Sequence, residues 1–401
     1  MKRSLQTFIL FFLCLAVFAG PVSAKSEPDG IVALLDGMAQ KAGGDRPVYQ
    51  TISDDGMGNV TLSGLSWHMN QKGARVDYNV EKLSVSNLRA RGNGVFAVGK
   101  ATFANTRIIA KGPQGKMDFS YLIPETTIRN GFIYSYRPEA GAIDNIFAGS
   151  VIGDTTTIPS VQVDFAGIRL AVNGIDVVWS GDPQTGFGTW KVTAASLVVP
   201  KNLLDNPKTG KNMLDELGYE KLDIAMNGDI VLEKTGDKLG VGYGIRLTAQ
   251  GMGTLEIAFA GRDIPGALFD MAKTINTGGK PDTAKILPLL FGIKLSGLKF
   301  RFEDNSLTRR LLDYAAKQQN TTPEAMTANG AAMIQISLAQ LGLSEFAGKV
   351  VAAYNAYMAS PKNITIRAKP ENPVAIATIM GLAAAPTAAI TMLGISVSAN
   401  D

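Results

Sequence analysis

The sequence predicts a β-rich α+β protein, with a long curved antiparallel sheet, short interrupting helices and a mostly helical C-terminal region. Two observations lead to this fold class. Apolar residues recur at every second position over much of residues 48–259, which is the period of a strand with one buried face. The 43 glycines fit many turns and strands better than a helical bundle, and 46% hydrophobic residues suffice for a large core.

The N-terminal residues have the layout of a secretory signal peptide. Lys2 and Arg3 give a basic start, residues 8–19 form an uninterrupted apolar run, and small residues lead up to Ala24. Such a run is short for crossing a bilayer. We therefore expect cleavage after Ala24 and a location in the periplasm, with an uncleaved inner-membrane anchor as the alternative.

The number of cysteines and the net charge limit which classes of protein the chain can belong to. Cys14 is the only cysteine and lies inside the predicted signal peptide, so the mature chain has no thiol for a disulfide, an iron–sulfur cluster or a zinc–thiolate site. A secreted eukaryotic protein of this size usually carries disulfides, which favours a bacterial envelope. Loss of Lys2 and Arg3 lowers the formal net charge from +4 to +2. Without a basic run, nucleic-acid binding is disfavoured.

The first half of the chain predicts one helix followed by strands. Residues 29–42 carry apolar side chains at helical spacing and are followed by two glycines, which predicts an amphipathic helix. In the strands that follow, the alternation shifts by one position after Gly64 and again between Val80 and Leu83. Such shifts predict bulges or kinks that curve the strands.

The most regular alternation lies in residues 222–259. The turn sequences KTGDK and QGMG divide this range into three strands, which predicts an antiparallel meander with one apolar face. The residues that we expect to line a ligand-binding apolar face are Leu239, Val241, Tyr243, Ile245, Leu247, Leu255, Ile257 and Phe259.

The other face of residues 239–247 is lined by Gly240, Gly242 and Gly244. A face without side chains lets another element approach closely or leaves room for a ligand. Close packing by a short helix is the first expectation, and a ligand is the alternative. The apolar face forms a core in either case, and incomplete cover would leave a groove suited to acyl chains.

The last third of the chain predicts mainly helices. Thr322 and Pro323 mark the start of one of them, as N-cap and first-turn residue. An earlier short helix in residues 282–292 is expected to end near Pro288.

Residues 372–400 contain no charged side chain. We expect them to form a buried helix, turn and strand, with a membrane anchor or membrane-surface contact as the alternative. The predicted organisation of the chain is a signal peptide (1–24), an N-terminal helix and first β region (25–200), a second β meander with short helices (201–303), and a mainly helical C-terminal region with a closing strand (304–401).

Most catalytic constellations lack their residues in this sequence. His68 is the only histidine, and the HExxH, GxSxG, P-loop and EF-hand patterns do not occur. The acid pairs Asp54–Asp55 and Glu303–Asp304 could serve glycoside hydrolysis, yet neighbours in a strand point to opposite faces. We expect no catalytic residue, no metal and no cofactor, and keep a carboxylate-based glycoside hydrolase as the least favoured alternative.

Four features of the chain together resemble a known family. They are the signal sequence, alternating strands such as VDYNVEKLSVSNL and LGVGYGIRLTA, the segment LSGLKFRFEDNSLTRRLLDYAAKQQ and the closing MLGISVSAND. This layout resembles uncharacterised proteobacterial periplasmic proteins of the YdgA-type family and, more distantly, AsmA-like envelope proteins. The resemblance implies a long curved sheet with an apolar concave face, which in AsmA-like proteins is associated with lipid movement between membranes. The chain lacks the length of those bridging proteins, which favours local binding or shuttling.

The sequence therefore predicts a non-enzymatic periplasmic envelope protein that binds a lipid or another apolar ligand on a curved sheet. The first alternative is a structural or interaction protein in envelope assembly or maintenance. In that case the C-terminal region would contact an envelope protein or the membrane surface.

Overall fold

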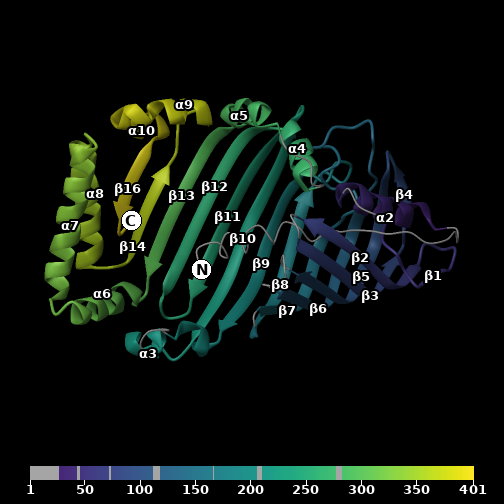
Figure 1. Cartoon of the computed structure of the whole chain (residues 1–401), viewed down its shortest axis with the longest axis horizontal. Helices are drawn as coiled ribbons and strands as arrows, with labels where there is room; N and C mark the ends of the chain where they lie inside the picture. The colour runs from purple at the N-terminus through teal and green to yellow at the C-terminus, as the bar shows by residue number, and fades with distance from the viewer. Residues whose placement is uncertain are drawn as a thin grey trace. The chain divides into compact units, whose positions relative to one another are not determined.

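A computed structural model describes residues 27–42, 46–71, 74–111, 118–165, 167–205, 210–276 and 282–401 (Figure 1). The predicted signal peptide lies outside the described residues. Strands predominate, their pairing is antiparallel, and several helices gather in the C-terminal region. The predicted fold class, a β-rich α+β chain with a long antiparallel sheet and short helices, is confirmed.

The chain divides into two compact units. Unit 1 comprises Met1–Arg169, Asp176–Phe187 and Gly266–Asp282, and unit 2 comprises Leu170–Ile175, Gly188–Pro265 and Thr283–Asp401. These are spatial groupings that do not coincide with the sequence divisions at residues 200 and 303, so those divisions stay a prediction.

Unit 1 is built on a sheet with the strand order β1-β2-β3-β5-β6-β7, in which β4 also pairs with β5. Strand β8 (Ile168–Gly181) is shared between the two units. The other elements of unit 1 are α2 (Asp29–Ala42), β1 (Thr51–Asp54), β2 (Val60–Gln71), β3 (Ala74–Ser86), β4 (Arg89–Gly92), β5 (Val95–Lys111), β6 (Asp118–Tyr134), β7 (Val151–Phe165) and α4 (Ala267–Asn276).

Helix α2 covers the apolar face of the unit 1 sheet. As its spacing predicts, α2 is amphipathic, and Leu34 and Leu35 are fully buried in one cluster with Leu65 of β2. Glycines allow a close approach at one point, since a Cβ built on Gly37 would lie 2.3 Å from the backbone nitrogen of Gly149. The helix and the sheet therefore enclose a buried core of this unit.

The predicted irregularities in the first strands are confirmed, and they line up across the sheet. The pairing of β2 with β3 leaves out Gly64 opposite Glu81. The next two pairings leave out Asn105 opposite Glu81, and Pro124 opposite Asn105. Gly64 and Asn105 have left-handed backbones, with φ of 65° and 48°. This line of kinks crosses β2, β3, β5 and β6, and it explains why the apolar phase shifts while the same face stays buried.

Unit 2 is an antiparallel sheet with the strand order β9-β10-β11-β12-β13-β14-β16, in which β15 also pairs with β13. The predicted meander forms β10, β11 and β12, and later strands join it from the C-terminal part of the chain. The strands are β9 (Gly188–Val199), β10 (Leu222–Thr235), β11 (Lys238–Ala249), β12 (Gly253–Pro265), β13 (Lys294–Asp304), β14 (Asn363–Ala368), β15 (Val374–Ala375) and β16 (Ile395–Ala399).

The helices of unit 2 lie at the ends and at one edge of its sheet. Figure 1 shows α3 and α6 at one end of the strands, α5, α9 and α10 at the other end, and α7 and α8 beside β16. Their bounds are η3 (Lys201–Leu204), α3 (Met213–Leu217), α5 (Thr283–Gly292), α6 (Leu307–Gln318), α7 (Pro323–Gln340), α8 (Ser344–Ala359), α9 (Ile376–Gly381), η4 (Leu382–Ala384) and α10 (Pro386–Leu393).

Two predicted helix boundaries have different outcomes. Thr322 caps α7 as predicted, since its hydroxyl accepts a hydrogen bond from the backbone N–H of Ala325 at 3.2 Å. The predicted end near Pro288 is wrong, because α5 continues through this proline to Gly292. A proline removes one helical hydrogen bond but keeps a helical φ. The packing of α5 against β12 and α9 holds the helix beyond that point.

The uncharged tail has the predicted order of helix, turn and strand, but its helices are not buried. Helix α9 has no buried residue, and α10 buries only Leu393. The expectation of a buried tail is therefore wrong for these helices, because each packs on the strand ends with one side only. No helix in the described part of the chain is both long and apolar enough to cross a membrane.

Candidate functional site

The predicted binding face is one side of the unit 2 sheet. Residues directly opposite each other in an antiparallel pair share a face and lie about 5 Å apart. The pairing of β11 with β12 aligns six of the eight predicted residues in three opposed pairs, Tyr243–Phe259, Ile245–Ile257 and Leu247–Leu255. The rings of Tyr243 and Phe259 are in contact, with centroids 5.7 Å apart. The predicted residues thus form one continuous apolar surface.

Strands β13, β14 and β16 extend this surface with residues that the sequence analysis did not assign to it. One row crosses five strands through Ile245, Ile257, Phe300, Ile366 and Val397. The added residues on β13 and β14 are Leu298, Phe300, Phe302, Ile364 and Ile366. The alternation in LKFRF and ITI was the available signal, but it predicts a strand without saying which strand is its neighbour.

The size of the surface follows from sheet geometry. From β10, where Ile230 lies opposite Tyr243, to β16 there are five strand spacings of about 4.8 Å each, or about 24 Å. From Tyr243 to Leu247 the strand rises about 13 Å. We call this surface, carried by β10 to β14 and β16, the apolar face of unit 2.

The centre of the apolar face is open to solvent. The exposed fraction is 37% for Tyr243, 46% for Leu298, 41% for Phe300 and 47% for Ile366. The helices that Figure 1 shows for unit 2 lie at the strand ends and beside β16 rather than across β10 to β13. Leu239, by contrast, is buried.

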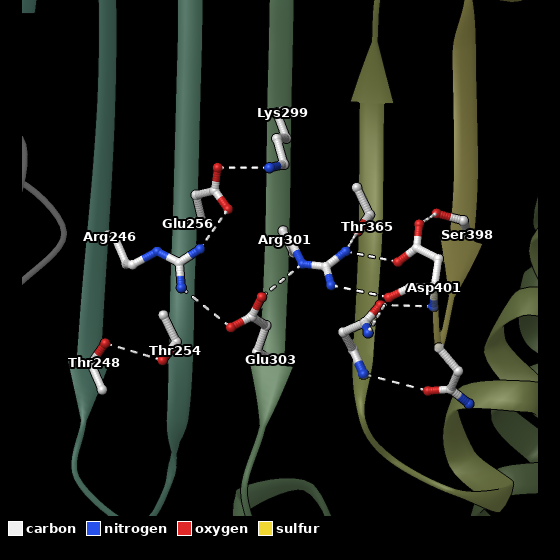
Figure 2. Close-up of polar contacts among 12 residues, drawn as sticks. Arg246, Thr248, Thr254, Glu256, Lys299, Arg301, Glu303, Thr365, Ser398 and Asp401 are labelled. Atoms are coloured by element: carbon white, nitrogen blue, oxygen red, sulfur yellow. Dashed lines mark hydrogen bonds and ion pairs between the residues drawn. The ribbon is translucent and has the colours of Figure 1, made fainter. Parts of the chain in front are cut away.

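The opposite face of the same strands is polar and carries a network of ion pairs (Figure 2). Lys299 donates a hydrogen bond to Glu256 at 2.6 Å. Arg246 reaches two carboxylates on neighbouring strands, with N···O distances of 3.4 Å to Glu256 and 3.3 Å to Glu303. The strict alternation along each strand therefore separates an apolar face from a charged one.

Arg301 extends this charged network to Asp401 at the C-terminus. Its guanidinium donates to Glu303 at 3.0 Å and to Asp401 at 2.7 Å. The hydrogen bond from Arg301 holds the pKa of Glu303 below its usual value. Hydrogen bonds from Ser398 and then Arg301 lower the pKa of Asp401 in the same way. Both carboxylates are thus ionised at neutral pH, and this face stays charged.

The glycine positions of β11 lie on the charged face, and the expected helix over them is not found among the described residues. A Cβ on Gly242 would lie 3.6 Å from the Cβ of Val231, and a Cβ on Gly244 would lie 3.1 Å from a carboxylate oxygen of Asp229. Val231 and Asp229 belong to β10, the neighbouring strand. The glycines therefore leave room for side chains of their own sheet.

One member of each acid pair has a lowered pKa. A general acid needs a raised pKa. Hydrogen bonds from the Asn59 side chain and the Met57 N–H lower the pKa of Asp55, and Arg301 lowers that of Glu303. Within the described ranges, no group of three or more histidine, cysteine or acidic side chains is placed to hold a metal ion.

A family model described as "Uncharacterized protein" matches residues 246–400, which run from the second half of β11 through β16. No curated protein matches the chain. The matched range contains most of the apolar face and all of α5, α9 and α10.

Proposed function

We propose that the protein is a non-enzymatic periplasmic envelope protein that holds the acyl chains of a lipid, or another apolar ligand, on the apolar face of unit 2. The observation that carries this proposal is the exposure of Leu298, Phe300 and Ile366 in the middle of a continuous apolar sheet surface. Apolar surface left in water is unfavourable by about 25 cal/mol per Å². A ligand of matching chemistry removes that cost.

The chemistry of the face favours alkyl chains. Its central rows consist of aliphatic and aromatic side chains, and the charged residues of the same strands point to the other side. An alkyl chain that binds there displaces no ion pair. The central rows offer no charged side chain with which a polar head group could pair, so the head group would lie outside these rows.

A simple balance favours a ligand with two acyl chains. Burial of about 200 Å² of apolar surface contributes about 5 kcal/mol. Association costs at least about 4 kcal/mol in lost freedom, so this area alone gives weak binding. A face of about 24 Å by 13 Å accommodates two chains side by side, and together they bury substantially more surface.

The periplasmic part of the proposal rests on the sequence. The basic start, apolar run and small residues before Lys25 support export, and the lack of cysteine after residue 24 suits a bacterial envelope protein without disulfides. Fractionation of cells that express the full chain tests this part directly. Recovery of the protein in the cytoplasmic fraction at its full length would contradict it.

The ligand test uses two adjacent residues of β14 on opposite faces. Ile366 points to the apolar face, and Arg367 is an exposed residue of the charged face. We expect lipid to be extracted from the natively purified protein and seen by mass spectrometry. Ile366→Asp should lower the recovered lipid about ten-fold or more, whereas Arg367→Asp should retain it. Failure to recover lipid from the unchanged protein, or an equal loss in both variants, would contradict the proposal.

A second function, that of an interaction protein, is favoured by one observation. Helix α7 has no buried residue and exposes Met333 and Ile336, and Leu341 at its C-cap is exposed as well. Such a stripe suits contact with another envelope protein. A crosslink from position 333 to one defined partner, lost on Ile336→Asp, would favour this function.

A further inference from the structure

We infer that α5, α9 and α10 form a docking surface for a lipid bilayer, placed at the end of the sheet where the apolar face of unit 2 would exchange its ligand. We call these three helices the docking rim. The exchange rests on the proposed function, whereas docking itself follows from the rim alone.

The three helices form one cluster. Figure 1 shows them in a row along one end of the unit 2 strands. Helix α5 contacts α9, and η4 contacts both α9 and α10. Helix α5 leads into β13, α9 follows β15, and α10 leads into β16, so the sheet fixes where each helix lies. Helix α5 and the later pair α9 and α10 thereby present one surface.

The outer side of the docking rim is apolar. Ile286 and Leu289 of α5 are half-buried, whereas Leu287 and Leu290 are exposed. Helices α9 and α10 add exposed methionines, with 59% of Met380 accessible. Large apolar side chains exposed on short helices gain most by entering the boundary between head groups and acyl chains of a membrane.

Helices α9 and α10 carry little polarity that would oppose such entry, and α5 carries one charged residue, the exposed Lys285. Residues 372–400 include α9 and α10 and carry no charge. The exposed Thr391 hydroxyl donates to the backbone carbonyl of Thr387 at 3.2 Å, so its hydrogen bond is made within the helix. A protein interface would instead be expected to offer a polar rim with donors and acceptors for its partner. The hydrocarbon boundary of a bilayer is therefore the occupant that fits best.

Two ion pairs lie near the docking rim. Lys294 lies 2.7 Å from Asp263, and Arg262 lies 3.7 Å from Glu233. Because each of these two cations lies beside an anion, they form no basic patch that draws the surface to anionic lipid. We therefore expect docking through apolar insertion, with little dependence on lipid charge or salt.

The docking rim leads directly to the apolar face of unit 2. Strand β13 starts at the rim and carries Leu298 before Phe300 and Phe302. The first row on β13 pairs Leu295 with Gly261 and Val374, and the next pairs Leu298 with Ala368 and Ala368 with Ile395. An acyl chain that leaves a bilayer at the rim would thus reach the exposed Leu298 before Phe300 and Phe302.

Vesicle flotation of the purified full protein tests docking. The probes are vesicles of phosphatidylethanolamine with phosphatidylglycerol, and vesicles of phosphatidylcholine alone. We expect the protein to float with both, at low and high salt. The rim variant Leu287→Asp with Met380→Asp should bind at least ten-fold more weakly. The matched control, Met333→Asp with Ile336→Asp on α7, also changes two exposed apolar residues and should float like the unchanged protein.

Three results would overturn the inference. They are failure of the unchanged protein to float, equal flotation of the rim variant and the α7 control, and binding that needs anionic lipid and is lost in salt. The thermal unfolding midpoint of each variant shows whether it is folded. Binding of a fluorescent fatty acid in vesicle-free solution separates this inference from the proposed function. The rim variant should bind it normally, and Ile366→Asp should lose it but still float. Loss of flotation by Ile366→Asp, or of fatty-acid binding by the rim variant, would contradict the separation of docking from ligand binding.

Discussion

The sheets of units 1 and 2 carry the same alternation of apolar residues but differ in what covers them. In unit 1, α2 lies on the apolar face, and Leu65 and Leu83 are fully buried. In unit 2, Leu298 and Phe300 lie on the apolar side of β13 and remain more than one-third exposed. The difference teaches that alternation identifies an apolar face, and that the presence or absence of a covering element decides whether this face is a core or a surface for a ligand.

The glycines of the two units make the same contrast. In unit 1, Gly37 and Gly149 let a helix approach the chain closely. In unit 2, Gly242 and Gly244 face side chains of the neighbouring strand, and no described helix packs over them. In unit 1, glycine thus allows a helix to pack closely. In unit 2, it only makes room for side chains of the neighbouring strand.

The largest expected effect is on the covered core of unit 1. Leu65→Ala should lower the free energy of unfolding by about 3 kcal/mol, because it leaves a cavity under α2. Leu298→Ala removes the same side chain from a half-exposed site and should cost less than about 1 kcal/mol. Urea denaturation of both variants measures the difference. Similar losses would mean that the apolar face of unit 2 is as well covered as the unit 1 core.

A second prediction concerns the cover itself. Gly37→Ala should destabilise the protein by about 1–3 kcal/mol, because the added methyl group meets the backbone at Gly149. Gly348 of α8 has no atom within 4 Å of a built Cβ, so Gly348→Ala should stabilise the protein by up to about 1 kcal/mol. Thermal unfolding should show midpoints that move in opposite directions. A Gly37→Ala protein as stable as the original would refute the close packing of α2.

The smallest expected effect is that of pH on the charged face of unit 2. Glu303 and Asp401 have lowered pKa values in the folded state. Their contribution to stability is therefore full above the ordinary carboxyl pKa of about 4, and it is lost as pH falls through the lowered values. Because both carboxylates are partly exposed, the contribution is modest.

Arg301→Met tests this sign, because it removes the donor shared by the two carboxylates. From about pH 6 to pH 2, the unfolding midpoint of the unchanged protein should fall further than that of Arg301→Met. Parallel pH profiles would show that the charged network does not contribute to stability.

Much of the fold follows from local sequence signals. The spacing of residues 29–42 predicts α2, and the alternation and turns of residues 222–259 predict the meander of β10 to β12. The phase shift at Gly64 predicts a local kink. Its alignment with Asn105 on β5 could not be predicted, because register between strands is a long-range property. Likewise, the proline inside α5 is tolerated through tertiary packing that no local rule contains.

From the sequence, only the residues of the candidate site that follow one another within a strand could be predicted. Tyr243 and Ile245 were identified from one uninterrupted strand. Phe300 and Ile366 were missed, because their place beside that strand depends on the order of strands in the sheet. The sequence also left open whether the face was covered. The helix that covers the unit 1 sheet, α2, precedes the strands of that sheet in the sequence. The sequences of the strands do not indicate whether a helix covers them.

Thiol labelling tests the central claim most directly, because Cys14 is the only cysteine of the chain. In a Cys14→Ser background, Ile366→Cys and Leu65→Cys place one thiol on the apolar face of unit 2 and one in the covered core of unit 1. In the lipid-free native protein, the thiol at position 366 should react nearly as fast as in denaturant and be slowed by added lipid. The thiol at position 65 should react only on unfolding. Equal protection of both thiols without lipid would contradict the account.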